Sequence, residues 1–276
     1  MTKNKLGYVT INGKENYKIS VFDHGLLYGD GVYETIRIFN GRAFLLERHL
    51  DRLYNSAKGI YLNIPYPKTK LISIIKSTYK ESKLVDAFMR IIITRGVGEQ
   101  GLASKSKPNL IIICNSRYFK PLEKISVLIS KVHRINKRAL DPKIKSLNYE
   151  NNILAYFDAK NKNFNDAILL NEKNMITEAT TTNLFIFKDE KLYTPSLESG
   201  ILNGVIRETI IENFQVTEKE LSVDDLLNAE EAFLSGTVNL ITSISKVNDK
   251  KFNKFEKAKE VFNKLIELTE KGVLLR

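Results

Sequence analysis

The sequence has a single cysteine, Cys114, among 276 residues, so no disulfide can form within one chain. It also lacks long apolar runs, since the longest, such as 110–114, fall far short of the roughly 18 residues that a membrane-spanning helix needs. Its first residues contain neither the apolar stretch nor the small-residue cleavage site of a secretory signal. These absences predict a folded cytoplasmic protein that has an apolar core.

Several kinds of reactive centre are also missing. The three histidines, His24, His49 and His133, are scattered and show no metal-ligand spacing, so no metal site is expected. No glycine-flanked serine motif or phosphate-binding glycine loop follows a strand, and Cys114 lies in an apolar run that is typical of an inert buried thiol. Thiol, serine and metal chemistry are therefore disfavoured, which leaves lysine chemistry, with Lys145 as the candidate.

Basic residues exceed acidic ones by 43 to 32, a net charge of +11. Such a balance suits either nucleic acid or small anionic substrates. Because the lysines are mixed with acids along the whole chain and no nucleic-acid motif is present, we expect a lysine-rich solvated surface and no nucleic-acid partner.

Length and patterning predict a two-domain α/β (α+β) protein. The polar segment 115–124 separates an N-terminal α/β domain, 1–118, from a C-terminal domain, 124–276, through a linker at 119–123. Strands are expected at 5–12, 17–22, 32–39, 43–45, 87–94, 110–114, 125–132, 167–170, 183–188, 191–194 and 231–235. Helices are expected at 47–60, 68–82, 148–161, 205–213, 223–228 and 255–269.

Seven segments follow one another in a familiar order. They are FDHGLLYGDGVYETIR (22–37), ERHLDRL (47–53), TRGVGEQGL (94–102), IKSLNYENNILA (144–155), ITEATTTNLFIFKD (176–189), GILNGVIRETI (200–210) and SGTVNLI (235–241). In these motifs the chain resembles the class IV, pyridoxal-phosphate-dependent aminotransferases, most closely the branched-chain enzymes; the family also holds D-amino-acid aminotransferases and aminodeoxychorismate lyases. The resemblance implies a fold-type IV enzyme with a small N-terminal α/β domain, a larger β-barrel-like C-terminal domain and the cofactor in the cleft between them.

The resemblance also assigns the cofactor-binding residues. They are Arg52, Lys145, Tyr149, Glu178, Val205, Ile206 and Thr237. Lys145 would hold pyridoxal phosphate as a Schiff base and, once freed, shuttle the α-proton. Glu178 would keep the pyridine nitrogen protonated, and Arg52 would bind the phosphate with the helix amides of Val205 and Ile206 and with Thr237. Tyr149, expected one helical turn after Lys145, would bond the phenolic oxygen.

The substrate residues are less uniform. The matching positions are Tyr28, Tyr33, Thr35, Phe88, Arg90 and Val238. Arg90 falls where branched-chain enzymes receive the γ-carboxylate of glutamate, and Tyr28 would reach into the partner subunit's site, which predicts a homodimer. Gln100 and Leu102 replace the loop residues that hold the carboxylate in D-amino-acid aminotransferases and lyases.

Three departures keep alternatives open. Phe88 and Tyr33 replace a tyrosine and a phenylalanine of branched-chain enzymes, and Thr35 replaces a glycine near a threonine that assists elimination in the lyases. The sequence therefore predicts transamination between an amino acid, a branched-chain L-amino acid in the first instance, and 2-oxoglutarate or another 2-oxo acid. A D-amino-acid aminotransferase with another carboxylate grip and an aminodeoxychorismate lyase are the alternatives.

Overall fold

The computed structural model describes residues 7–99, 101–102, 106–116, 119–120 and 122–275. The chain divides into two compact units. Unit 1 comprises Met1–Tyr118, Ile144–Asn148 and Thr269–Arg276, and unit 2 comprises Phe119–Lys143 and Tyr149–Leu268. Unit 1 thus contains two short segments that the sequence patterns assigned to the C-terminal domain.

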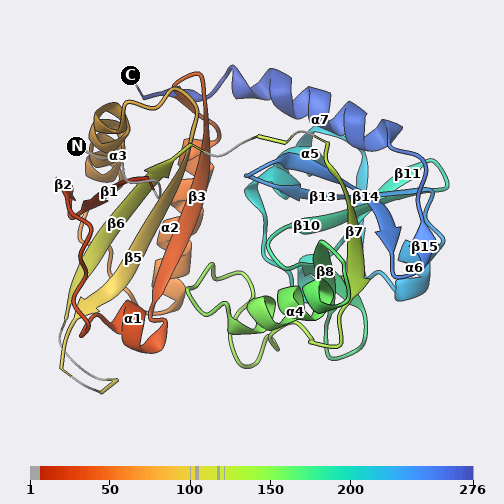
Figure 1. Ribbon diagram of the computed structural model, residues 1–276, viewed down its shortest axis with the longest axis horizontal. Coiled ribbons are helices and arrows are strands. Elements are labelled where there is room, and N and C mark those ends of the chain that lie inside the picture. The colour runs from red at the N-terminus through yellow and green to blue at the C-terminus, as the bar shows by residue number, and fades with distance from the viewer. Residues whose placement is uncertain (1–6, 100, 103–105, 117–118, 121, 276) are drawn as a thin grey trace. The chain divides into compact units, whose positions relative to one another are not determined.

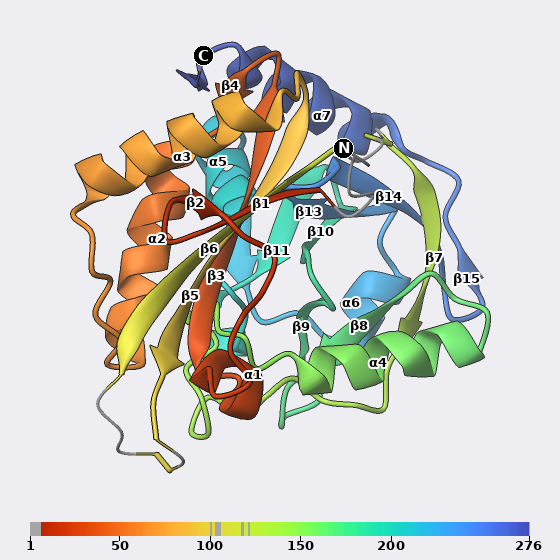
Figure 2. The same ribbon diagram turned by 60° about the vertical axis from the view of Figure 1, so that its left-hand side comes forward.

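Unit 1 is built on a seven-stranded sheet with the order β16-β4-β3-β5-β6-β1-β2. Its strands are β1 (Tyr8–Ile11), β2 (Lys14–Glu15), β3 (Gly31–Phe39), β4 (Arg42–Ala43), β5 (Ala87–Val97), β6 (Lys107–Asn115) and β16 (Val273–Leu274). Its helices are α1 (His24–Tyr28), α2 (Leu46–Gly59) and α3 (Lys68–Ser82). Figures 1 and 2 show α2 and α3 on one face of this sheet.

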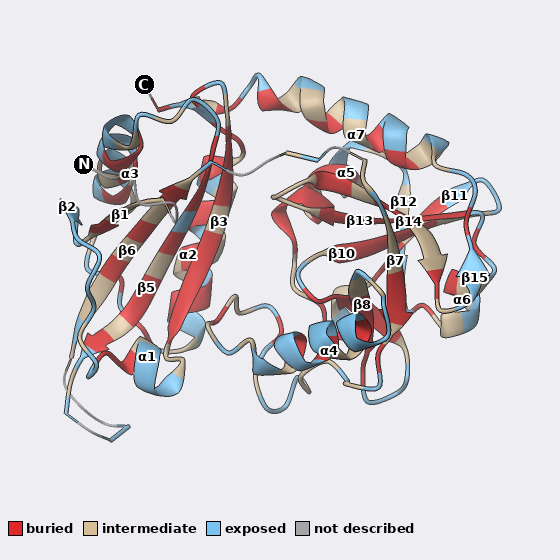
Figure 3. Ribbon diagram, viewed as in Figure 1, coloured by how far each residue is buried: buried red, intermediate tan, exposed pale blue. Residues whose placement is uncertain are grey.

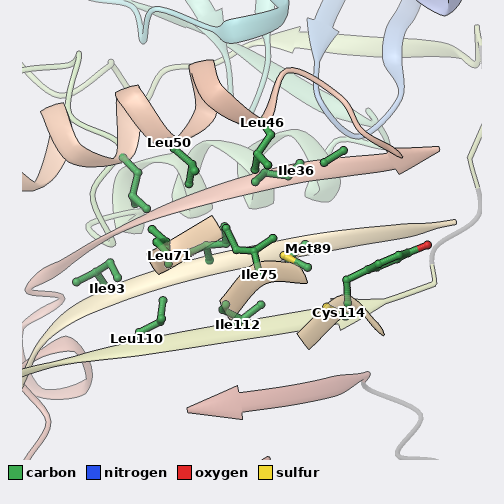
Figure 4. Packing of buried hydrophobic residues seen from close by; sticks show 14 of the residues in the cluster. Ile36, Leu46, Leu50, Leu71, Ile75, Met89, Ile93, Leu110, Ile112 and Cys114 are labelled. Atoms are coloured by element: carbon green, nitrogen blue, oxygen red, sulfur yellow. The ribbon is translucent and has the colours of Figure 1, made fainter. Parts of the chain in front are cut away.

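The core of unit 1 lies between the sheet and these two helices. Alternate residues of β3, β5 and β6 point into it, among them Ile36, Met89 and Ile112, and they pack against Leu50 of α2 and apolar residues of α3 (Figure 4). The other face of the central strands carries the alternate residues of the same strands. The two-residue period therefore decides which side chains remain available for chemistry.

Unit 2 is a closed barrel with added strands. Its strands are β7 (Lys124–Ile129), β8 (Asp166–Leu170), β9 (Ile176–Ala179), β10 (Asn183–Lys188), β11 (Lys191–Pro195), β12 (Val216–Lys219), β13 (Glu231–Gly236), β14 (Leu240–Val247) and β15 (Lys250–Lys251). Its helices are α4 (Glu150–Asn161), the 3-10 helix η1 (Leu197–Ser199), α5 (Val205–Asn213), α6 (Val223–Leu227) and most of α7 (Glu256–Thr269).

The barrel closes because β9 pairs with both β8 and β10. The circuit runs β10-β13-β14-β7-β8-β9 and returns to β10 through the pair Asn183 and Glu178. Its interior is apolar, with Leu184, Leu234 and Ile244 among the buried residues. Closure leaves none of these six strands as an open edge.

Several elements differ from the sequence predictions. The turn at Asn12-Gly13 does join two strands, but the predicted strand over 17–22 is wrong: only Val21 and Phe22 form a turn there, and the segment is mostly exposed. The alternation of apolar residues in 17–22 is therefore not matched by a burying surface within the chain. Local patterns also missed α1, β9, β12 and β14; the strands among them pair with segments that lie apart along the chain. No helix in the described residues is long and apolar enough to cross a membrane.

Candidate active site

Lys145 belongs to unit 1, where a short segment runs beside β3. The amide of Tyr33 donates to the carbonyl of Lys145 at 3.0 Å, and the amide of Leu147 donates to the carbonyl of Gly31 at 2.9 Å. The amide of Lys145 itself donates to Ser56 Oγ at 3.1 Å. These bonds fix the main chain of Lys145 against the edge of the sheet.

The side chain of Lys145 lies against Tyr33 on the sheet face opposite the helices. Its Nζ is 3.3 Å from Tyr33 Oη and 4.4 Å from the ring centroid. The guanidinium of Arg90 contacts the same ring at 4.8 Å, and Arg90 pairs in register with Thr35. Arg90 is exposed and forms no ion pair among the described residues. This open face therefore presents an amine, a phenol, a hydroxyl and a cation without a carboxylate partner.

Phe88 lies on the same face but serves as packing. It is buried, and the guanidinium of Arg37 stacks on its ring at 4.2 Å while also contacting Phe39 at 4.7 Å. Burial lowers the pKa of Arg37, and the charge of Asp86 opposes that shift. The Arg37 stack, which sequence reasoning did not single out, forms a wall beside Arg90.

Arg52 lies on α2 and points to the helix side of β3. Its Nε and Nη2 donate to the two carboxylate oxygens of Glu34 at 2.6 and 2.9 Å, and His49 Nδ1 donates to Glu34 Oε2 at 2.8 Å. Burial alone would raise the pKa of Glu34, but the charge and hydrogen bonds of Arg52, together with those of His49, lower it to about 2. Burial also lowers the pKa of His49, helped by the charges of Arg52 and Lys145. We call Glu34, His49 and Arg52 the Glu34 triad.

Tyr28 ends the short helix α1, which Asp23 caps by accepting from the amide of Gly25 at 2.7 Å. The Tyr28 side chain is 41% exposed, and its hydroxyl accepts from the amide of Gly101 at 3.2 Å. In Figure 3 most of α1 is exposed. Tyr28 thus lies on the surface of unit 1.

Glu178 lies in β9 of unit 2 and is 5% exposed. Arg134 Nη2 lies 2.9 Å from its Oε1, while Asn183 Nδ2 and the amide of Leu202 donate to its Oε2 at 2.9 and 3.1 Å. Each of these donors stabilises the ionised carboxylate. Arg134 and Asn183 are neighbours that sequence reasoning missed, although Asn183 belongs to the motif over 176–189.

The N-terminus of α5 carries Val205 and Ile206, both buried. Its N-cap is Gly204, and no side chain caps the helix. A Cβ at Gly204 would meet Asn183 Oδ1, so the close approach of the main chain here requires glycine. The first amides of α5, together with the helix dipole, therefore form a site suited to an anion.

Thr237 and Val238 are half-buried and lie in the turn between β13 and β14. Tyr149 is the N-cap residue of α4, with φ −109° and ψ 5°. The expectation that Tyr149 lies one helical turn after Lys145 is wrong, because α4 begins at Glu150 and the segment of Lys145 is paired to β3.

The structure brings the predicted residues together in two groups. Unit 1 holds Tyr28, Tyr33, Thr35, Arg52, Phe88, Arg90 and Lys145. Unit 2 holds Tyr149, Glu178, Val205, Ile206, Thr237 and Val238. In the loop that bears on the substrate class, Leu102 is 86% exposed and Gln100 lies outside the described residues.

Comparison with known proteins gives this arrangement a family. Residues 31–247 match the family model described as amino-transferase class IV. The chain belongs to the class IV aminotransferases. This enzyme is 37% identical to the "Putative branched-chain-amino-acid aminotransferase" of Methanocaldococcus jannaschii over 89% of both chains. It is also 30% identical to the aminodeoxychorismate lyase of Bacillus subtilis over 87% of both chains. Identity to the D-alanine aminotransferase of Staphylococcus epidermidis is 30%, over 87% of this chain and 89% of that one.

Solved structures agree with the family. The branched-chain aminotransferase of Thermoproteus uzoniensis with norvaline superimposes with a TM-score of 0.90 at 26% identity, covering 96% of this chain and 95% of that one. The T.th. branched-chain amino acid aminotransferase complexed with N-(5'-phosphopyridoxyl)-L-glutamate gives 0.90 at 25% identity over the same shares. This class IV aminotransferase therefore has the fold-type IV architecture that its motifs predict.

Proposed function

We propose that this class IV aminotransferase uses pyridoxal phosphate to exchange the amino group between a branched-chain L-amino acid and a 2-oxo acid such as 2-oxoglutarate. The observation that carries the proposal is the open face of unit 1, where the Lys145 amine and the Arg90 guanidinium contact the same Tyr33 ring. The similarity to branched-chain aminotransferases of known structure supports it.

The described residues suit a phosphate-bearing pyridine cofactor. Lys145 offers the amine, Glu178 a buried ionised carboxylate for the ring nitrogen, and the uncapped N-terminus of α5 an anion site. Arg52, Thr237 and Tyr149 complete the proposed set with a guanidinium, a hydroxyl and a phenol. When bound, the cofactor supplies an electron sink for the substrate's α-carbon.

The chain's own residues then manage protons and charge. Lys145 Nζ would take the proton from the substrate's α-carbon and return it from the same side of the sheet. Tyr33, 3.3 Å from that nitrogen, limits its range of positions. Glu178, held ionised by its three donors, would keep a proton on the ring nitrogen. Each of these duties concerns a named atom that the fold already holds in place.

Arg90 is the proposed receptor for the γ-carboxylate of glutamate or 2-oxoglutarate. Its guanidinium, which has no carboxylate partner among the described residues, faces the same side as Lys145 and is flanked by Thr35 and the Phe88 wall. Arg90→Ala should raise KM for glutamate about tenfold or more and leave KM for leucine nearly unchanged, because a charge-assisted bond is lost only with the dicarboxylate. Equal losses on both substrates would assign Arg90 to the α-carboxylate, which would favour a D-amino-acid enzyme.

A second function, elimination from aminodeoxychorismate, is favoured by one observation. Thr35 places a half-buried hydroxyl on the open face beside Arg90, where branched-chain enzymes have glycine. If the protein is a lyase, it releases pyruvate and 4-aminobenzoate from aminodeoxychorismate, and Thr35→Gly abolishes that release. A transaminase should tolerate Thr35→Gly, because the smaller residue leaves more room for a branched side chain.

We further propose a homodimer in which Tyr28 reaches the partner subunit's site. Unit 1 exposes Leu26 at 61% and Leu27 at 41% next to Tyr28, and α4 of unit 2 exposes Leu154 at 52% and Phe157 at 56%. Neighbouring apolar side chains exposed in this way on each unit are typical of surfaces that a partner covers. Light scattering should give a dimer for the unaltered chain, and a fully active monomer would contradict the proposal.

A half-reaction screen tests the function directly. The pyridoxal-phosphate-loaded chain is mixed in turn with L-leucine, L-glutamate, D-alanine, D-glutamate and aminodeoxychorismate while the visible absorption of the cofactor is followed. L-leucine and L-glutamate should change the spectrum, and the D-amino acids should not. Borohydride should fix the cofactor on the peptide that contains Lys145, and Lys145→Ala should lose that label. A response to D-alanine alone would replace the branched-chain proposal with the D-amino-acid alternative.

A further inference from the structure

Arg134 is a buried cation of unit 2 that none of the recognised motifs contains. Its three guanidinium nitrogens have three different partners: Nη2 lies 2.9 Å from Glu178 Oε1, Nη1 donates to Asn152 Oδ1 at 3.2 Å, and Nε donates to the Gly200 carbonyl at 3.4 Å. The side chains of Arg134 and Glu178 are 11% and 7% exposed. The planar fork of arginine is thus held by a helix, a turn and the acid itself.

The other carboxylate oxygen of Glu178 is held by the turn that leads into α5. Asn183 Nδ2 donates to Glu178 Oε2 and to the Leu202 carbonyl, both at 2.9 Å, and the Leu202 amide returns a bond to Oε2 at 3.1 Å. Asn183 Oδ1 also lies where Gly204 admits no Cβ. The acid proposed for the ring nitrogen and the helix end proposed for the phosphate are therefore joined by one short framework.

The charge of Arg134 has a chemical consequence for Glu178. A carboxylate this buried tends to take up a proton, because burial penalises the charged form. A protonated Glu178 could no longer leave the proton on a pyridine nitrogen, since it would donate its own. An adjacent guanidinium with a direct charge-assisted bond opposes that protonation and also fixes the direction of the carboxylate.

We infer that Arg134 is a positioning residue that keeps Glu178 ionised and aimed at the cofactor's ring nitrogen. The inference rests on the proposed function, because it concerns the residue assigned to that nitrogen. Arg134 itself touches neither the cofactor nor the substrate in this role. It acts through Glu178 alone.

A double-mutant cycle on cofactor binding tests the inference. Pyridoxal phosphate is titrated into the apo form of the full chain, and into Arg134→Gln, Glu178→Gln and the double variant, with Kd read from absorbance. Arg134→Gln should weaken binding about tenfold or more. In the Glu178→Gln background the same change should cost no more than roughly twofold, because its route of action is already removed.

Three further measurements separate this role from a structural one. A cofactor analogue with a CH group in place of the ring nitrogen should bind Arg134→Gln and the unaltered chain within roughly twofold. Arg134→Lys, which keeps the charge and loses the fork, should restore part of the affinity and serves as the folding-competent variant if Arg134→Gln does not fold. Arg138→Gln, an exposed arginine of the same segment, is the matched control.

Unchanged affinity in Arg134→Gln, or equal losses in both Glu178 backgrounds, would overturn the inference while leaving the proposed function intact. An equal loss of affinity for the nitrogen-free analogue would do the same. If the unaltered chain bound no pyridoxal phosphate, the proposed function itself would fall and the inference with it.

Discussion

Replacing Glu34 by glutamine should expose how much the Glu34 triad contributes to unit 1. The carboxylate is fully buried and accepts from Arg52 at 2.6 and 2.9 Å and from His49 at 2.8 Å. Glutamine keeps the shape but leaves the Arg52 guanidinium without its countercharge. Removing one partner of a buried ion pair costs about 3–5 kcal/mol, so Glu34→Gln should lower the free energy of unfolding of unit 1 by about 3 kcal/mol at pH 7.

The same triad predicts a pH dependence of known sign. The pKa of Glu34 is about 2 in the folded protein against an ordinary value of 4.5. As pH falls below 4.5 the unfolded chain binds the proton first, so the stabilisation is full above about pH 4.5 and is lost as pH falls towards 2. Each pH unit between the two pKa values is worth about 1.4 kcal/mol, which gives on the order of 3 kcal/mol in all and a loss of about 2 kcal/mol between pH 7 and pH 3.

Urea unfolding followed by circular dichroism at pH 7 and at pH 3 measures both effects. The gap between the unaltered chain and Glu34→Gln should narrow from about 3 to about 1 kcal/mol, because glutamine does not titrate. The control is Glu47→Gln on the same helix, since Glu47 is 55% exposed in its pair with Lys68 and such pairs are worth about 0–1 kcal/mol. A gap that is absent at pH 7, or that does not change with pH, would refute the reasoning.

Three further outcomes test other parts of the fold. Burial raises the pKa of Cys114 to about 12, so a thiol reagent at pH 8 should label it only after unfolding, and rapid labelling of the native chain would contradict its burial. Gly96 has φ +93° and its Cβ would meet the Lys107 carbonyl, so Gly96→Ala should cost more than about 2 kcal/mol in urea unfolding. Gly13→Ala, at φ +78° but in open space, should cost less and is its control. Ser222 caps α6 in a capping box, so Ser222→Ala should lower stability by about 1 kcal/mol, and no change would remove that role.

Local patterns determined much of the architecture. The helical periodicity over 68–82 and 205–213 gives α3 and α5 with the predicted bounds, and the predicted helix over 47–60 is α2, shifted by one residue. The burial of Cys114 and the turn at Asn12-Gly13 also follow from neighbouring residues alone. Seven motifs in order were enough to predict the family, because that information is carried by residue identity and not by contacts.

What the sequence could not determine are the pairings between distant segments. Lys145 pairs with β3 and contacts Tyr33, the barrel closes through Asn183 and Glu178, and Arg134 meets Glu178. Sequence spacing instead placed Lys145 and Tyr149 on neighbouring turns of one helix, because local propensity has no knowledge of the β3 edge that holds Lys145. The sequence by itself thus determined most of the elements, the family and the chemically active residues. Only the tertiary structure decided which charges are paired, since a buried charge is stabilised by whatever partner the fold brings within hydrogen-bonding distance.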